Sequence, residues 1–254
     1  MNEQNAKSSA AQLIALIGRL LEYPEAGLNP YRQELIDIVD NSPLPQDAKL
    51  NLTGFIENYS EIPLLDWQSD YDGLFERGRS LSLLIYEHIH GESRDRGQAM
   101  VDLLAQYEKA GLEIAANELP DHLPLFLEFV STQGEQSIGW VQDIVPVLSL
   151  LAVRLEKRGS NYSTLMWSLL KLCGASVDIS ELREQVQNES EDHTAKQLDK
   201  VWEEEAVTFG GDEINGGCPT NKYRPTEKQR KDCDVPLNWS PMDARHKNSN
   251  ARGA

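Results

Sequence analysis

Residues 8–24 read SSAAQLIALIGRLLEYP, and this stretch decides the fold class. Its large apolar residues recur at the i, i+3, i+4, i+7, i+8 spacing of a single buried helical stripe: Leu13, Leu16, Ile17, Leu20 and Leu21. Ser8 or Ser9 is placed to cap the first turn, and Pro24 is placed to stop the helix. The stretch therefore predicts an amphipathic α-helix that buries one face.

The same helical spacing recurs along most of the chain. It predicts further helices over residues 30–39, 45–59, from 71 onward, 81–90, 93–111, 123–130, 144–155 and 162–173, then two weaker acidic ones over 179–186 and 198–202. Asp121 is placed to cap the helix that begins at 123, and Pro146 has to lie in a first turn or kink its helix. No two-residue alternation and no Asn-Gly or Asp-Gly hairpin joins strand-like runs. We therefore expect an all-α fold, a single compact multi-helix domain over residues 8–205.

The character of the sequence changes near Phe209. Two Gly pairs, several Pro and little apolar periodicity predict a disordered, flexible C-terminal tail over residues 206–254. Residues 219–254 carry 8 Lys and Arg against 4 Asp and Glu, so the tail could fold back over an acidic body, or it could be inert. Cys218 and Cys233 lie in this tail at a spacing that does not match known zinc knuckles.

The chain is strongly acidic. Its formal net charge is −17, and residues 1–218 hold 16 Lys and Arg against 37 Asp and Glu, a net of −21. Such a body repels phosphate backbones and anionic membrane surfaces, so we expect no nucleic-acid partner. It would attract a basic partner, although solubility alone accounts for the same charge. The charge by itself does not choose between these two interpretations.

Three kinds of sequence feature that would indicate export or membrane insertion are missing from this sequence. Its three Cys form no CxxC pair and no disulfide framework. Residues 1–11 show no basic region followed by an apolar core, as a signal peptide would. No stretch approaches the ~20 apolar residues that a membrane span needs. We expect a cytoplasmic protein with no direct membrane insertion.

The densest polar cluster runs from YDGLFERGR (71–79) to EHIHGESRDRG (87–97). His88, His90 and Glu92 admit one enzymatic interpretation, a metal-dependent hydrolase. His88 and His90 are two residues apart, however, so they point to different sides of a helix, unlike the i, i+4 pair of an HExxH zinc site. His88 also continues the apolar stripe of residues 81–85, so a buried, hydrogen-bonded histidine is the simpler interpretation.

A second cluster reads ELPDHLP, residues 118–124. Capping of the following helix accounts for Asp121 and Pro124, because the first N–H groups of a helix have no intrahelical partner. Capping does not account for Glu118 and His122, which form a polar cluster where the helix is predicted to begin.

Motifs for nucleotide binding and nucleophilic catalysis are missing. The sequence has no GxSxG elbow, no P-loop GxxxxGK[ST] and no GxGxxG after a strand. We therefore expect no catalytic residues, no metal and no cofactor.

Four motifs, in the same order, resemble the NarJ-type nitrate reductase assembly chaperones, which belong to the wider TorD/DmsD-like group of redox-enzyme maturation proteins. They are RLLEYP (19–24), YDGLF (71–75), EHIHGESRDRGQAM (87–100) and ELPDHLP (118–124). The PDHLP motif points to the wider group, and the run 87–100 points to the nitrate reductase branch. The resemblance covers about residues 10–205 and does not extend to the tail.

This resemblance implies an all-helical chaperone without catalytic activity. Such proteins bind the apo catalytic (alpha) subunit of nitrate reductase, including its N-terminal segment, permit molybdenum cofactor insertion and delay membrane docking. We expect this chain to do the same, as a monomer or weak homo-oligomer. The resemblance also places a client-peptide site near the Asp-His of the second cluster and the helices that face it: Tyr71, Phe75, Glu87, His88, Glu92, Asp95, Asp121 and His122.

The residues give a physical account of such a site. A basic amphipathic client segment would lay its apolar face between helices while carboxylates receive its cations. Ordering that segment costs entropy, so the site has to supply apolar anchors such as Phe75 as well as charge.

Overall fold

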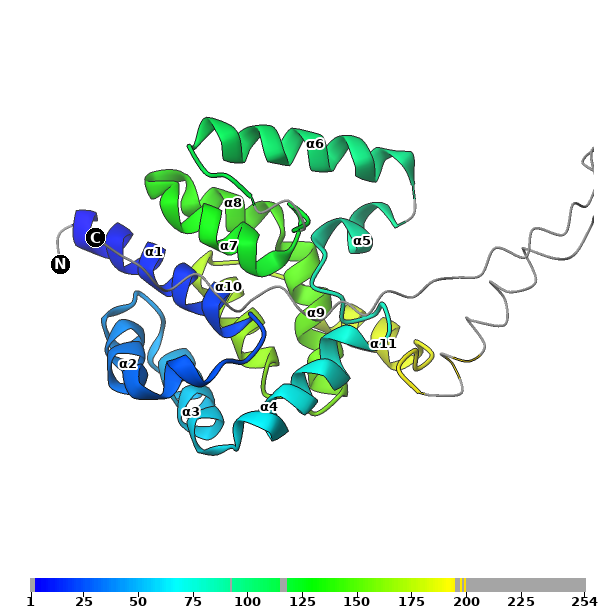
Figure 1. Cartoon of the computed structure of the whole chain (residues 1–254), viewed down its shortest axis with the longest axis horizontal. Helices are drawn as coiled ribbons and strands as arrows, with labels where there is room; N and C mark the ends of the chain where they lie inside the picture. Colours follow the sequence, from blue (N-terminus) through cyan, green and yellow to red (C-terminus); the bar gives the residue numbers. More distant parts are fainter. Residues whose placement is uncertain (1–2, 92, 115–117, 195–196, 198, 200–254) are drawn as a thin grey trace, which may run out of the picture. The chain divides into compact units, whose positions relative to one another are not determined.

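The computed structural model describes residues 3–91, 93–114, 118–194, 197 and 199 (Figure 1). Apolar stripes at helical spacing build eleven α-helices in this part of the chain, and no strand occurs within it. The helices are α1 (Glu3–Leu20), α2 (Arg32–Asn41), α3 (Gln46–Glu61), α4 (Leu64–Tyr71), α5 (Ile85–His90), α6 (Arg94–Lys109), α7 (Leu123–Thr132), α8 (Ser137–Asp143), α9 (Val145–Lys157), α10 (Ser163–Leu172) and α11 (Ile179–Gln187). Short 3₁₀ helices cover Ala26–Tyr31 and Gly134–Gln136, and a π-helix covers Asp72–Glu76. The expected all-α class is confirmed.

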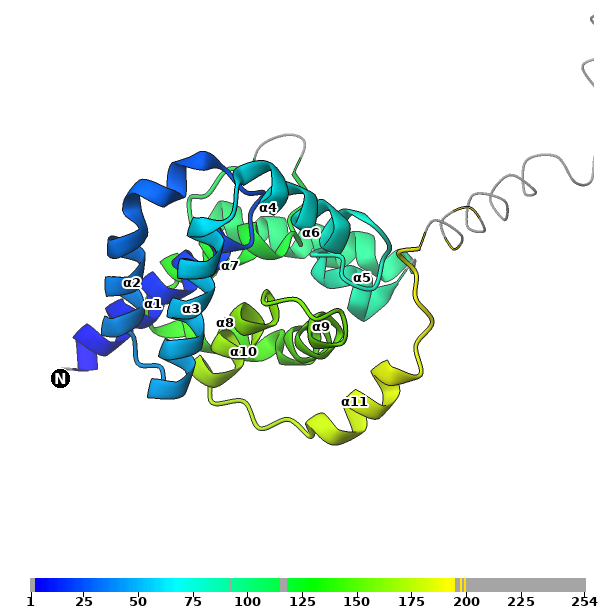
Figure 2. The same ribbon diagram turned by 90° about the horizontal axis from the view of Figure 1, so that it is seen from below.

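The core is built where the apolar helices cross. α1 packs along α7, α9 packs against α10, and α11 lies against α9, as Figures 1 and 2 show. Gly18 allows the close approach of α1 to α7, because a Cβ there would lie 3.2 Å from the Leu127 Cβ and 3.3 Å from the Pro124 carbonyl oxygen. The described residues share this continuous core and form one compact unit.

An aromatic cluster joins the N-terminal helices to α10. Its centre is the fully buried ring of Tyr162, which contacts four other rings edge-on or tilted: Phe55, Tyr59, Tyr71 and Phe75. Trp67 Nε1 donates a hydrogen bond of 2.8 Å to the Tyr162 hydroxyl. A buried hydroxyl thus gains a partner while its ring fills the core.

Several predicted boundaries are confirmed. α3 begins directly after Pro45, Ser93 precedes α6, and Pro146 lies in the first turn of α9, where its missing N–H is tolerated. α11 covers the first of the two weak acidic helices. The second, over 198–202, falls largely outside the described residues, as do the tail of 206–254 and the boundary before it.

Three helices differ from their predicted bounds, and one helix was missed. The helix expected over 81–90 begins only at Ile85, as α5, because the apolar residues 81–84 form a turn and a bridge and not a helix. α1 begins at Glu3, well before the Ser8 or Ser9 cap, because the preceding residues are also compatible with a helix. The helix expected from Tyr71 is the end of α4, which begins at Leu64 and continues as the π-helix. α8 was missed because it buries only Ser137 and Val141, too few residues for a periodic signal.

In the described ranges no single helix is long and apolar enough to cross a bilayer. The bent pair Gly134–Asp143 and Val145–Lys157 reaches the necessary length and apolar content only when the two segments are taken together.

Candidate functional site

Two short segments pair where α5 and α7 begin. The Ile85 N–H donates to the Asp121 carbonyl oxygen at 2.9 Å, and the Leu123 N–H donates to the Leu83 carbonyl oxygen at 2.8 Å. Leu84 and His122 consequently form an isolated antiparallel bridge. Through this pairing, the second sequence cluster comes to lie against residues 83–85, directly before the second half of the first cluster at 87–97.

Asp121 is a fully buried carboxylate, with no exposed surface. Its Oδ2 accepts a hydrogen bond of 3.1 Å from the Tyr86 N–H, in the first turn of α5. The expected role of Asp121 as the cap of its own helix was wrong, because His122 is the N-cap residue of α7 and no side chain caps it. Leu84 precedes α5 and has no acceptor in its side chain, so Asp121 caps α5 from another part of the chain.

Arg96 links α6 to this buried carboxylate. Its Nη1 lies 3.2 Å from Glu87 Oε1, and its Nη2 lies 4.0 Å from Asp121 Oδ2. Arg96 Nε and Asp121 Oδ1 are both buried without a hydrogen-bond partner in the described chain. The three residues therefore form a partly satisfied charged network, in which a small movement of α6 would change the pairing.

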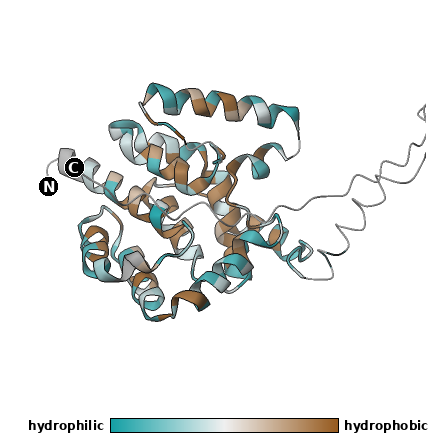
Figure 3. Cartoon of the chain, in the orientation of Figure 1, coloured by the Kyte–Doolittle hydropathy of each residue, from teal (hydrophilic) through white to brown (hydrophobic). Residues whose placement is uncertain are grey.

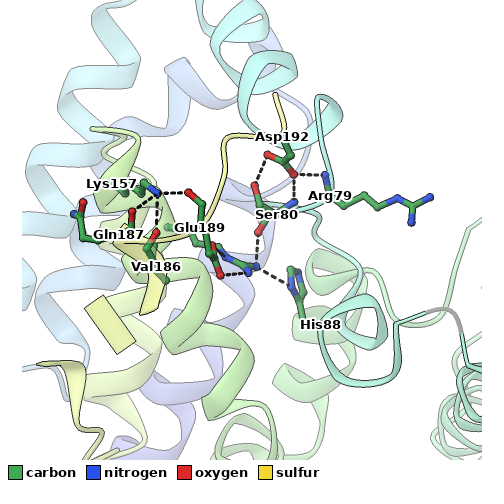
Figure 4. Close-up of polar contacts among 9 residues, drawn as sticks. Arg79, Ser80, His88, Lys157, Val186, Gln187, Glu189 and Asp192 are labelled. Carbon is green, nitrogen blue, oxygen red and sulfur yellow. Dashed lines mark hydrogen bonds and ion pairs between the residues drawn. The ribbon is translucent and has the colours of Figure 1, made fainter. Parts of the chain in front are cut away.

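His88 is a half-buried, hydrogen-bonded histidine, less buried than the simpler interpretation of the sequence predicted. Its Nε2–H donates to the Ser82 carbonyl oxygen at 2.8 Å. Its Nδ1 lies 3.5 Å from Arg154 Nη1, the contact that a dashed line marks at His88 in Figure 4. Burial lowers the pKa of His88 below 6.5; the hydrogen bond to Ser82 opposes this shift, and the nearby Arg154 guanidinium adds to it. His88 is thus held in its neutral form, with both ring nitrogens engaged.

His122 and His90 have different surroundings. Burial lowers the pKa of His122 below 6.5, although the carboxylates of Glu118 and Asp121 oppose the shift. The His90 ring packs against Tyr86 at 5.5 Å between centroids. Across the described residues, no group of three or more His, Cys, Asp or Glu could hold a metal ion, and Glu92 lies outside them.

The structure brings together only part of the predicted set. Asp121 is in contact with the first turn of α5, and Glu87 joins it through Arg96. Asp95 lies exposed in the first turn of α6. Tyr71 and Phe75 are only 4% and 6% exposed in the aromatic cluster around Tyr162, where they belong to the core.

The sequence analysis did not single out three residues that hold this region together. They are Arg96, Arg154 and Tyr107, whose hydroxyl donates to the Pro120 carbonyl oxygen at 2.7 Å. Arg96 lies inside one of the quoted motifs. Its contact with Asp121 could not be predicted, because the two residues are far apart in the sequence and local spacing does not report such contacts. Tyr107 lies within the helix predicted over 93–111, and helical spacing accounts for its buried ring but gives no signal of a hydrogen bond from its hydroxyl.

The surface around the bridge is both acidic and partly apolar. Residues 85–122 carry eight Asp and Glu against three Lys and Arg, a net of −5. Ile89 on α5, Val101 on α6 and Leu119 before α7 are 50%, 59% and 43% exposed. Figure 3 shows hydrophobic residues spaced among hydrophilic ones along α6, which buries only Leu103 and Tyr107. We call the outer faces of α5, α6 and residues 118–120 the α5–α6 surface.

Three cavities of the described structure lie away from the α5–α6 surface. They have volumes of about 310, 340 and 400 Å³ and border α3, α10 and the turn at 158–161. None of these three is lined by a predicted site residue. The predicted residues therefore lie on a surface and in the core behind it, away from these cavities.

Comparison with known proteins gives this arrangement a family. Residues 41–167 match the family model described as the nitrate reductase delta subunit. The chain is 45% identical over 207 residues to the nitrate reductase molybdenum cofactor assembly chaperone NarJ of Escherichia coli K12, a match that covers 81% of this chain and 86% of NarJ. The chain belongs to the NarJ-type family of nitrate reductase assembly chaperones. The resemblance in the four sequence motifs is thereby confirmed.

One further curated relative and one solved structure are also similar to this chain. Identity is 42% over 216 residues to the probable nitrate reductase molybdenum cofactor assembly chaperone NarW of E. coli K12, covering 84% of this chain and 91% of NarW. A candidate redox enzyme maturation protein from Archaeoglobus fulgidus aligns in three dimensions over 71% of this chain and 94% of its own, with 16% identity and a TM-score of 0.41.

Proposed function

We propose that this NarJ-type chain binds the apo catalytic subunit of a respiratory nitrate reductase through its N-terminal segment, permits molybdenum cofactor insertion and delays membrane docking until assembly is complete. It does so in the cytoplasm, without catalytic activity of its own. The observation that carries the proposal is the 45% identity to a named molybdenum cofactor assembly chaperone over 86% of that protein's length.

The α5–α6 surface is suited to such a client segment. The net charge of −5 over residues 85–122, the segment that contains this surface, would attract a basic peptide and raise the rate of encounter. Ile89, Val101 and Leu119 leave apolar side chains in water, which an amphipathic client could cover. Charge steers the client, and the apolar contacts supply affinity that salt does not screen.

Burial divides the predicted site residues between two roles. Glu87 and Asp95 are accessible enough to meet client cations, and half-buried His122 stands at the edge of the surface. Asp121 and His88 are held behind it by hydrogen bonds, so they fix the shape of the site. Tyr71 and Phe75 support the fold more remotely, through the aromatic cluster.

Complementation of a strain that lacks its own chaperone tests this function. Expressed in a nitrate-respiring host without its assembly chaperone, the chain should restore nitrate reductase activity and the molybdenum content of the catalytic subunit. The finished enzyme should purify without the chaperone. Failure to restore cofactor content, with the chaperone folded and expressed, would refute the proposal.

The alternative from the sequence, a hydrolase that uses a metal on His88, His90 and Glu92, makes an opposite prediction. Both ring nitrogens of His88 already have hydrogen-bond partners, Ser82 and Arg154, so neither is available to a metal. We therefore expect purified protein to contain no stoichiometric zinc or iron, as elemental analysis would report. About one equivalent of tightly bound metal would favour the hydrolase.

A further inference from the structure

A segment that includes the end of α11 and the acidic residues after it connects α9 with the loop that precedes α5. Lys157 Nζ, at the end of α9, donates to the Val186 carbonyl oxygen at 2.7 Å and to the Glu189 carbonyl oxygen at 3.0 Å. Asp192 then reaches the loop of residues 79–82 (Figure 4). We call residues 186–192 the strap, because they tie the end of α9 to this loop.

Asp192 accepts three hydrogen bonds from two consecutive residues of the loop. The N–H groups of Arg79 and Ser80 both donate to Oδ2 at 2.7 Å, and the Ser80 hydroxyl donates to Oδ1 at 2.8 Å. Gly78 makes room for the carboxylate: its φ is +88°, and a Cβ there would lie 2.7 Å from Asp192 Cγ. The fit is specific to a short acid against a glycine.

Arg154 completes the connection from α9. Its Nε and Nη2 bind both oxygens of Glu189, at 2.8 and 2.7 Å, in the paired geometry that suits a guanidinium and a carboxylate. Its Nη1 donates to the Ser80 carbonyl oxygen at 2.9 Å and also faces His88. The Arg154 side chain is 17% exposed, so these bonds are shielded from solvent screening.

The loop held in this way leads directly into the candidate site. Its last residue, Ser82, accepts from His88, and the next residue, Leu83, begins the pairing with residues 121–123. α5 has only six residues, and a helix that short is not stable by itself. Its orientation therefore depends on its two attachments, the bridge to Asp121 and the strapped loop.

We infer that Asp192 and Arg154 are positioning residues for client binding, which hold the 79–82 loop on α9 and so present α5 to the client in one orientation. The inference rests on the proposed function and deepens it. A preorganised surface binds more tightly because less conformational freedom is lost on association. The strap does not need to touch the client to have this effect.

Asp192→Ala is the direct test, measured by titration of the client's N-terminal peptide and by amide hydrogen exchange of the full chain. We expect roughly three- to tenfold weaker binding. Exchange should become faster at the amides of Ser80, Tyr86 and Leu123, while α10 stays protected. Ser80→Ala, which removes one of the three hydrogen bonds, should show a smaller change in the same direction and serves if Asp192→Ala folds poorly.

Arg183→Ala is the matched control. Arg183 on α11 pairs with Glu156 on α9 at 3.0 Å, and this contact does not reach the 79–82 loop. The control should therefore leave both peptide affinity and exchange at Tyr86 as in the wild type. An equal effect of the control and Asp192→Ala would overturn the inference, since α11 docking alone would then explain it.

Failure of the inference can be told from failure of the proposed function. If the wild type binds the peptide and Asp192→Ala binds equally well with unchanged exchange, the positioning role is overturned and the function stands. If the wild type does not bind, the proposed client is wrong. Exchange at Tyr86 and Leu123 then still decides whether Asp192 holds α5, and unchanged exchange overturns that as well.

Discussion

The contacts of Asp121 explain how a buried carboxylate is accommodated directly before α7. Its carbonyl oxygen accepts from Ile85 and its carboxylate from Tyr86, so one residue anchors the first turn of a neighbouring helix twice. Arg96, at 4.0 Å, supplies the nearby positive charge that a buried carboxylate requires. The residue joins α5, α6 and α7 at a single point.

Substitution of Asp121 separates the hydrogen bond from the charge. Asp121→Ala leaves the Tyr86 N–H and Arg96 without their partner, and we expect a loss of about 1–3 kcal/mol in the free energy of unfolding. Asp121→Asn keeps an acceptor for Tyr86 and should lose less. Urea denaturation of both variants measures this order, and equal stability of the Ala variant and the wild type would contradict the assigned role.

The two half-buried histidines, His88 and His122, predict how stability depends on pH. Burial is the largest cause that lowers the pKa of both His88 and His122 below the ordinary 6.5. The unfolded chain therefore binds more protons than the folded one as the pH falls below about 6.5, and the free energy of unfolding should decrease there. His122→Gln should reduce the slope between pH 6.5 and 5 in denaturation curves. An unchanged slope would mean that His122 titrates normally in the folded protein.

At the scale of elements, helices that bury a wide apolar face could be predicted from sequence, and elements fixed by distant contacts could not. α3, α6 and α9 appear where their spacing and their flanking Pro or Ser place them. α4 carries only the i, i+3, i+7 positions Leu64, Trp67 and Tyr71 in an acidic stretch, which is a weak signal.

The candidate site was predicted in the same partial way. Its two clusters were found in the sequence, but the bridge between Leu84 and His122 depends on pairing between segments more than thirty residues apart. The contacts of Asp192 with residues 79 and 80 span more than a hundred residues of sequence. Local periodicity contains no information about either contact, and this is why Asp121 was assigned to the wrong helix.

The proposed client site predicts that exposed apolar side chains of α5 and α6 contribute to peptide binding. Ile89→Ser and Val101→Ser remove exposed side chains, so we expect little change in thermal midpoint. Each should weaken client-peptide binding by about 1 kcal/mol, roughly fivefold, at all salt concentrations. Leu65→Ser, at a 78% exposed position on α4, is the control and should bind like the wild type. If the control is affected as much as the other two, the client binds elsewhere.

On the scale of the whole molecule, the helical body combines a large acidic charge with the small α5–α6 surface that we propose binds the client. The net of −21 over residues 1–218 acts at a distance and is screened by salt. Apolar contacts between the client and α5 or α6 would act only at van der Waals distance, and salt does not screen them. Selectivity for one client would come from both together, since charge alone attracts any basic peptide.

Isothermal titration of the full chain with the N-terminal peptide of the nitrate reductase catalytic subunit tests the central claim most directly. A scrambled peptide of the same composition and charge serves as the control. We predict saturable binding of the native peptide, weakened but not abolished as salt is raised, and much weaker binding of the scrambled one. Equal affinity for the two peptides, or no binding of either at low salt, would contradict the account.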